Sequence, residues 1–173
     1  MRKNTEMKKL TPFLIIAIFI ITIVGIFLSL ASSKKMIVVV NDNIDAKPIE
    51  IQKGKYQDSD CGMVIDDLRD ISQVISPSGK TWFFHDHGGF VKWIEDKEFK
   101  DKAKIWVKTR DSKKWLDAKN TFYSLRDKTA MGYGFGAYEK NQKNFVDFDT
   151  MRLRMLRGET LSNPSIKKQL LGQ

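Results

Sequence analysis

The stretch that decides the fold is Ile71-Ser72-Gln73-Val74-Ile75-Ser76-Pro77-Ser78-Gly79-Lys80-Thr81-Trp82-Phe83-Phe84. Both of its ends, residues 71–75 and 81–84, are rich in β-branched and aromatic side chains, which is typical of β-strands. Pro77 and Gly79 lie between these ends, and proline and glycine at this spacing indicate a turn. We therefore predict a β-hairpin over residues 71–84.

A helix and a third strand are predicted directly after the hairpin. Gly88-Gly89 opens this segment, and large apolar residues then recur at near-helical spacing, as on one face of an amphipathic helix. These apolar residues are Phe90, Val91, Trp93, Ile94 and Phe99. Residues 103–109 alternate as a strand does, with Ile105 and Val107 on one face and Trp106 on the other.

A similar order of elements follows in the C-terminal half. Residues 115–125 indicate strand, turn and strand, and the glycine-rich residues 131–138 indicate a strand with close backbone approaches. A second helix, which Gly158 ends, is marked by Phe145, Phe148, Met151, Leu153, Met155 and Leu156. We predict an α+β body of two small ββαβ-like units, about 56–110 and 111–158, followed by a tail of residues 159–173.

An apolar segment near the N-terminus predicts a membrane anchor. Residues 11–33 contain no charged side chain, and about 20 such residues suffice for a helix to cross the hydrocarbon core. Four basic residues precede this segment and only Glu6 opposes them, so the positive-inside rule places residues 1–10 in the cytoplasm. We predict a single-pass protein of the cytoplasmic (inner) membrane with its C-terminal body in the periplasm.

The alternative interpretation of the apolar segment is a cleaved signal peptide. Leu30-Ala31-Ser32-Ser33 offers small residues near a possible cleavage site, although the apolar run is longer than the usual signal core. No cysteine follows closely, which excludes a lipoprotein anchor. Residues 34–55 are predicted to be a linker, in which the β-branched run 36–40 is either a first strand or a stiff exit from the membrane and a polar stretch follows it.

The charge of the chain argues against nucleic acid as a partner. The formal net charge is +9, but six of the 30 basic residues and one of the 21 acidic residues lie in positions 1–35. The body therefore carries 24 basic and 20 acidic residues. This mild excess is evenly mixed, so we expect no nucleic-acid binding and at most a weak attraction to anionic lipid.

The single cysteine is the most informative candidate site residue. We predict a short strand over residues 61–65, in which Cys61 and Met63, two residues apart, share a face. A thiolate and a thioether are soft ligands that suit Cu(I), whereas a structural Zn²⁺ site usually takes four ligands. Ordinary packing of two apolar side chains explains the same spacing.

Three further residues are weaker ligand candidates. His85 and His87, the only histidines, flank Asp86 at the end of the predicted hairpin. A strand end places both imidazoles on one side for a metal, whereas Asp86 as the N-cap of the next helix leaves both imidazoles solvated. Met131 precedes the glycine-rich stretch and is either a third sulfur ligand or a core residue. Met151 and Met155 are predicted to be core residues.

Enzymatic chemistry is not expected. The carboxylates are scattered without a general acid–base pair, and the sequence contains no nucleophile motif. The spacing Gly132-x-Gly134-x-Gly136 is no phosphate loop, because no Lys-Ser/Thr follows it. A thiol enzyme that uses Cys61 with His85 is the least favoured alternative.

Four motifs in order give a resemblance to a known family. Asp60-Cys61-Gly62-Met63-Val64-Ile65 resembles the Cys-Gly-Met signature of the NosL family. Trp82-Phe83-Phe84 with Asp86 resembles the family's Phe-Phe-Asp segment. Trp115-Leu116-Asp117-Ala118 resembles its Trp-(Ile/Leu)-Asp-Ala segment. Thr129-Ala130-Met131-Gly132-Tyr133-Gly134 resembles its Thr-Pro-Met-Gly-x-Gly segment. The ordered set covers residues 60–158.

The resemblance implies a function. NosL-like proteins are exported, membrane-attached Cu(I)-binding accessory proteins associated with copper delivery to nitrous oxide reductase, and their fold is similar to a pair of ββαβ units. The resemblance implies copper ligation by Cys61 and Met63, with Met131 as a third ligand ahead of His85 and His87. A periplasmic cuproenzyme or another copper-handling protein would be the partner.

The chain also departs from the family pattern. Many relatives carry a second cysteine before the Cys-Gly-Met signature, where this chain has Asp58-Ser59-Asp60. Many are lipoproteins, and Ala130 replaces the family's proline. The alternative function is therefore a NosL-like scaffold, an interaction subunit of a membrane complex that carries no copper.

Overall fold

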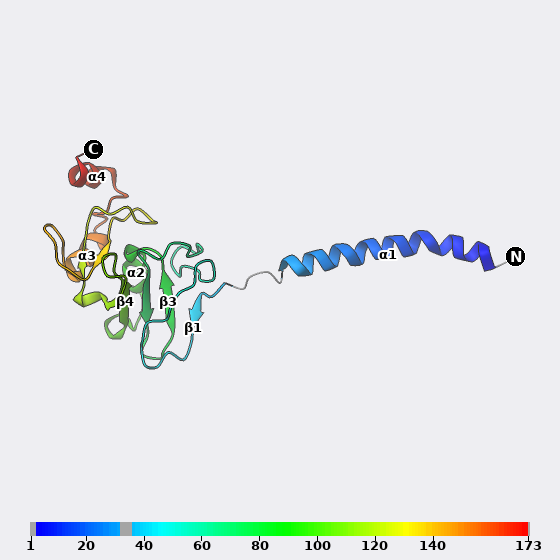
Figure 1. Cartoon of the computed structure of the whole chain (residues 1–173), viewed down its shortest axis with the longest axis horizontal. Coiled ribbons are helices and arrows are strands. Elements are labelled where there is room, and N and C mark those ends of the chain that lie inside the picture. Colours follow the sequence, from blue (N-terminus) through cyan, green and yellow to red (C-terminus); the bar gives the residue numbers. More distant parts are fainter. Residues whose placement is uncertain (1–2, 32–35, 173) are drawn as a thin grey trace. The chain divides into compact units, whose positions relative to one another are not determined.

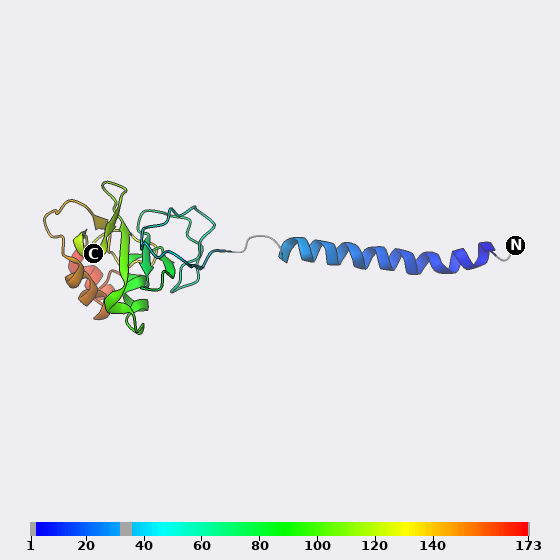
Figure 2. The ribbon, with the colours of Figure 1, turned by 90° about the horizontal axis from the view of Figure 1, so that it is seen from below.

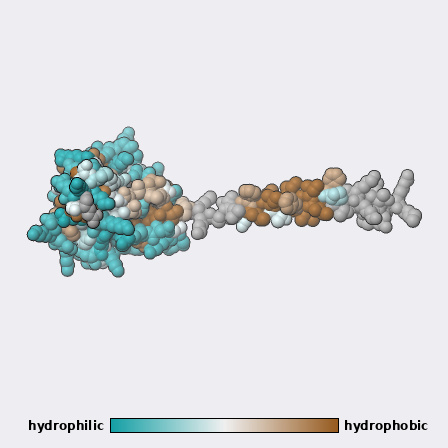
Figure 3. Space-filling view, turned by 90° about the horizontal axis from the view of Figure 1, so that it is seen from above, coloured by the Kyte–Doolittle hydropathy of each residue, from teal (hydrophilic) through white to brown (hydrophobic). Residues whose placement is uncertain are grey.

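The chain divides into two units, which we describe separately (Figure 1). A computed structural model describes residues 3–31 and 36–172. The first unit is the helix α1 (Lys3–Ala31), which contains one stretch, Pro12–Ser29, long and apolar enough to cross a membrane. Figure 3 shows this stretch as a continuous hydrophobic surface. Residues 32–33 of the predicted anchor lie outside the described residues.

The second unit, Met36–Gln173, is built on a five-stranded antiparallel sheet in the order β1-β3-β2-β4-β5 (Figures 1 and 2). Its strands are β1 (Val39–Val40), β2 (Ser72–Ile75), β3 (Thr81–Phe84), β4 (Lys104–Lys108) and β5 (Trp115–Asp117). Ser72 pairs with Phe84 and Ile75 with Thr81, which confirms the predicted hairpin. Gly79 has φ +79° in the turn, and an added Cβ would meet the Asn43 backbone at 3.0 Å.

The helix α2 (His87–Ile94) follows β3 and packs on β2 and β3. Its N-cap is Asp86, whose side chain accepts a hydrogen bond from the Gly88 N–H. The helix buries Phe90, Val91 and Ile94 against the sheet. The short 3₁₀ helix η1 (Lys100–Lys102) leads into β4, so β2, β3, α2 and β4 form the first predicted ββαβ unit.

The α+β class is confirmed, but the second predicted unit is not a separate copy of the first. β5 completes the first sheet by pairing with β4. After η2 (Ala118–Asn120), β6 (Phe122–Tyr123) and β7 (Ala137–Tyr138) form a two-stranded sheet. The helix α3 (Phe148–Leu156) packs on α2 and β6, and no strand follows it up to residue 172. One apolar core joins both halves, and it includes Val74, Phe90, Tyr123, Phe148 and Met151.

Residues 36–55 differ from the linker that the sequence predicts, because they belong to the compact second unit. The Gln73 side chain holds the Ile49 backbone through two hydrogen bonds, from Ile49 N–H (2.9 Å) and to Ile49 C=O (2.6 Å). Trp106 Nε1 donates to the Ala46 carbonyl at 2.8 Å. Ile51 packs in a second apolar cluster with Tyr56 and others, so this polar segment is fixed by distant partners.

The C-terminal residues contain a short helix. α4 (Pro164–Leu171) lies within the predicted tail 159–173, with Asn163 as its N-cap and Gly172 at its end. None of its side chains is buried.

The acid sensitivity of the fold is predicted to depend on His87. Burial lowers the pKa of His87 to about 4, from 6.5 in the unfolded chain. Since the unfolded state then binds the proton more readily, the free energy of unfolding should fall as the pH drops from about 6.5 to about 4, by about 3 kcal/mol in total. Urea unfolding of the metal-free protein at pH 7 and pH 4.5 measures this loss. His87→Gln, which does not titrate, should show a clearly smaller loss, and an equal loss in both proteins would contradict the assignment.

Candidate metal centre

Cys61 lies in a tight turn, which corrects the predicted strand over residues 61–65. The Gly62 N–H donates to the Asp58 carbonyl at 3.0 Å, and the Asp58 N–H donates to the Met63 carbonyl at 2.8 Å. Gly62 has φ +74°, a left-handed conformation that glycine adopts without strain. Only Val64 forms a bridge, with Gln57. Cys61 and Met63 therefore do not share the face of a strand, because the chain reverses between them.

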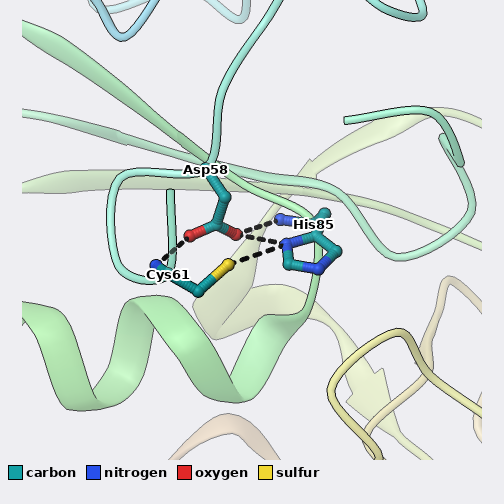
Figure 4. A group of neighbouring side chains, drawn as sticks. All are labelled: Asp58, Cys61 and His85. Carbon is teal, nitrogen blue, oxygen red and sulfur yellow. Dashed lines mark hydrogen bonds and ion pairs between the residues drawn. The ribbon is translucent and has the colours of Figure 1, made fainter. Parts of the chain in front are cut away.

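Asp58 organises this turn and links it to the end of β3 (Figure 4). Its carboxylate is 3% exposed. Oδ1 accepts hydrogen bonds from the Asp60 N–H at 2.8 Å and the Cys61 N–H at 3.0 Å. Oδ2 accepts the His85 N–H at 2.8 Å and lies 2.5 Å from His85 Nδ1. One buried side chain thus joins two segments that are far apart in the sequence.

Cys61 and His85 come together through Asp58. Cys61 Sγ lies 3.9 Å from His85 Nδ1, and one ligand atom from each of Asp58, Cys61 and His85 lies within 4.8 Å of the others. Figure 4 shows the sulfur and the carboxylate approaching the same ring nitrogen. His85 is buried, whereas Cys61 is partly exposed. The three side chains therefore form a candidate metal site that is open on the side of the thiol.

The electrostatics of the site favour its protonated form when no metal is bound. Burial, followed by the nearby Asp58 and Asp60, raises the pKa of the Cys61 thiol. The hydrogen bond with Asp58 raises the pKa of His85 despite the opposing effect of burial. Burial alone would raise the pKa of Asp58, but its hydrogen bonds from His85, Cys61 and Asp60 bring it below the ordinary value. A metal ion would therefore displace protons on binding.

The donor set fits a soft or borderline ion. The thiolate of Cys61 and an imidazole nitrogen are both accepted by Cu(I), whereas a carboxylate oxygen such as that of Asp58 suits harder ions. Asp58 is already saturated with hydrogen-bond donors, so its role toward Cu(I) is to position the other two groups. Metal-ligating groups in proteins are commonly oriented by such carboxylates.

The geometry does not match a thiol nucleophile. In an activated Cys-His pair, the thiol and the orienting carboxylate use opposite ring nitrogens. Here Cys61 and Asp58 both face Nδ1 of His85. The raised pKa of the thiol also works against a resting thiolate.

The loop that carries Met131 is fixed beside the same strand end. The fully buried Asp86 accepts the Met131 N–H at 2.9 Å on Oδ2 and the Gly88 N–H at 3.1 Å on Oδ1. Tyr133 packs over Gly88, where an added Cβ would lie 2.4 Å from its ring. The Met131 side chain is partly buried, and Met63 is 45% exposed.

His87 lies away from this cluster. It is fully buried in the apolar core, where its Nδ1 lies 2.6 Å from Ser72 Oγ and its ring packs edge-on against Tyr123. Its Nε2 has no hydrogen-bond partner among the described residues.

Two predictions for this region have different outcomes. The N-cap role of Asp86 is confirmed, but the prediction that both imidazoles are then solvated is wrong, since both histidines are buried. Met151 and Met155 are core residues, as predicted.

Sequence reasoning missed Asp58. The available signal was an aspartate three residues before Cys61, in a segment where Gly62 permits a turn, since Asp side chains commonly accept backbone N–H groups two or three residues ahead. Its bond to His85 spans 27 positions and has no local signal.

Comparison with known proteins shows the fold. No protein-family model matches the chain, and no curated protein matches its sequence. Among solved structures, the chain is similar to the copper chaperone NosL from Shewanella denitrificans, with a TM-score of 0.50 and 13% sequence identity. The match covers 60% of this chain and 96% of that chain. The chain therefore has a NosL-like fold.

Replacing the carboxylate at position 58 should lower the pKa of His85. In Asp58→Asn the negative partner of Nδ1 is lost, so the pKa of His85 should move down toward its ordinary value. NMR titration of the imidazole in the metal-free protein measures this shift. Asp60→Asn, which alters a weaker neighbouring charge, is the control and should leave most of the elevation in place. An unchanged His85 pKa in Asp58→Asn would contradict the described ion pair.

Proposed function

We propose that this protein is an exported, membrane-anchored metallochaperone that binds Cu(I) and passes it to another protein. The observation that carries the proposal is the Cys61 thiol, which lies 3.9 Å from His85 Nδ1 at a partly exposed turn of a NosL-like fold. The solved structure with this fold is that of a copper chaperone. A soft thiol beside an imidazole suits Cu(I). The second cysteine that many NosL-like proteins carry before the Cys-Gly-Met signature has no equivalent in this chain.

The proposed ligands have distinct roles. Cys61, as thiolate, supplies the strongest bond, and Met63 offers an exposed thioether from the same turn. Met131 is the proposed third ligand, supported by the Asp86 contact that holds its backbone next to His85. His85 is the competing third ligand, supported by its proximity to the sulfur.

Low coordination supports transfer. Cu(I) is stable with two or three ligands, so a recipient's ligand can join the ion before Cys61 leaves it. The partly exposed thiol gives a partner access, while the buried Asp58 keeps the turn in place. Protons compete with the metal for the thiolate, so acid weakens binding.

The proposed location follows from α1. Its apolar stretch would remain as a single membrane span, with residues 1–10 in the cytoplasm and the body in the periplasm. The proposed recipient is a periplasmic cuproenzyme such as nitrous oxide reductase, which the family resemblance implies.

Removal of the thiol should abolish tight Cu(I) binding. Loss of a partner that only orients a metal ligand typically costs 10–100-fold in affinity, so Cys61→Ser should cost at least about 100-fold. Titration of Cu(I) against a competing chelator under reducing conditions measures the dissociation constant. Asp60→Asn should bind nearly as well as the unchanged protein. Equal, weak binding by Cys61→Ser and the unchanged protein would refute the copper proposal and favour the scaffold alternative.

The third ligand can be identified by comparing two variants. If Met131 binds the ion, Met131→Leu should weaken Cu(I) binding by about 10-fold or more, while His85→Gln should have the smaller effect. The same chelator competition measures both. Met151→Leu, a swap of similar volume at a buried core position, controls for methionine loss and should leave the affinity unchanged. The reverse order of effects would transfer the role to His85.

A further inference from the structure

A basic cleft lies on the second unit, and it contains none of the proposed copper ligands. Its volume is about 690 Å³. Three loops, among them the β4–β5 turn, form it together with the ends of β4 and β7. The residues that carry the inference are Lys53, Leu68, Arg69, Lys108, Lys113 and Tyr138. We call this set the basic cleft.

The charges around the basic cleft are unbalanced. Its full lining has five basic residues and only two acidic ones, Asp67 and Asp111. One basic residue, Arg110, is used internally, since it forms two bonds of 2.6 Å with the buried Asp70. The Asp111 carboxylate is engaged by the backbone, because it accepts hydrogen bonds from the N–H groups of Ser112, Glu139 and Lys140.

Among the described residues, two cations of the basic cleft have no salt-bridge partner. Arg69 is held by Asp67, whose carboxylate accepts hydrogen bonds from its Nε at 2.8 Å and its Nη2 at 2.5 Å. The Lys108 side chain is only 20% exposed, and its Nζ lies 3.6 Å from Glu50 and 5.1 Å from the Trp115 ring centroid. In the described part of the chain, no salt bridge involves Lys53 or Lys113. The exposed side chains of Lys53 and Lys113 are therefore available to an anion.

The backbone at Lys113 supports a role for its side chain. Lys113 has φ +57°, a left-handed conformation that favours glycine or asparagine. The buried Thr109 fixes this turn, because its carbonyl accepts the Lys113 N–H at 3.1 Å and its hydroxyl accepts the Lys114 N–H at 3.2 Å. The turn therefore holds the Lys113 backbone in place in the lining of the cleft.

The remaining lining residues are uncharged: Leu68, Tyr138 and Thr109. Leu68 is partly buried, and the Tyr138 ring is held in place because its hydroxyl donates to Asp127 at 3.0 Å. A ligand for this cleft therefore combines an anionic group with an uncharged body. The volume lies in the range of small-molecule sites. Arginine and lysine together are the usual partners of phosphate oxygens.

We propose that the basic cleft binds the phosphodiester headgroup of an anionic phospholipid. Free phosphate esters share this chemistry, but a lipid is favoured because the same chain carries an apolar helix suited to a membrane. Clustered lysine and arginine residues next to an anionic bilayer bind such headgroups. This inference goes beyond copper binding and needs only the proposed anchoring.

Hydrogen exchange of the full chain in nanodiscs tests the proposal. The probes are phosphatidylcholine nanodiscs with and without phosphatidylglycerol, read by mass spectrometry. Phosphatidylglycerol should slow exchange in residues 66–69 and 108–113, and this protection should be lost in the double variant Lys53→Glu/Lys113→Glu. Both lysines are exposed, so the variant should fold.

Matched controls separate a site from general charge. Lys167→Glu/Lys168→Glu makes the same charge change on the exposed face of α4 and should keep the protection. Equal loss in both double variants, or no protection in the unchanged protein, would overturn the site. Glycerol phosphate, added with phosphatidylcholine nanodiscs, could slow exchange in the same residues as much as phosphatidylglycerol does. That result would overturn the proposal that a lipid is the ligand of the basic cleft. Cu(I) affinity should be the same in all these proteins, so a failed copper proposal leaves this test intact.

Discussion

The candidate centre depends on one buried carboxylate. Asp58 accepts backbone N–H groups from its own turn and from His85, and it pairs with the His85 ring. A buried carboxylate is unfavourable unless its oxygens are satisfied, so the turn and the strand end must come together. Without this interaction, Cys61 would sit on an exposed loop with no fixed relation to a second ligand.

The same interaction decides the chemistry that the site favours. Burial, supported by the nearby Asp58, raises the pKa of the Cys61 thiol, and the hydrogen bond with Asp58 raises the pKa of His85, so these two groups retain their protons when no metal is bound. A protonated thiol is a poor nucleophile, but a soft metal ion displaces its proton readily. This combination suits reversible metal carriage better than covalent catalysis.

Elements set by local signals could be predicted from the sequence. The β2–β3 hairpin followed from Pro77 and Gly79, and the apolar helix α1 followed from composition. The course of residues 36–55 could not be predicted, because it depends on hydrogen bonds between Gln73 and the distant Ile49. The second ββαβ unit also failed as a prediction, because β5 pairs with the first sheet.

The site was predictable in part, since Cys61 and His85 were both identified as candidates. Their separation from His87 was not predictable, because α2 begins at His87 and turns that ring into the core. Asp58 was missed because its partner lies 27 positions away. Whether Met63 and Met131 join the ion depends on side-chain positions that sequence order does not specify.

X-ray absorption at the copper edge of the Cu(I)-loaded protein measures whether Cys61 binds the ion. We expect a low-coordinate Cu(I) ion whose sulfur scattering includes Cys61 and therefore decreases in Cys61→Ser. An ion bound only by nitrogen and oxygen, with the same spectrum in both proteins, would contradict this expectation.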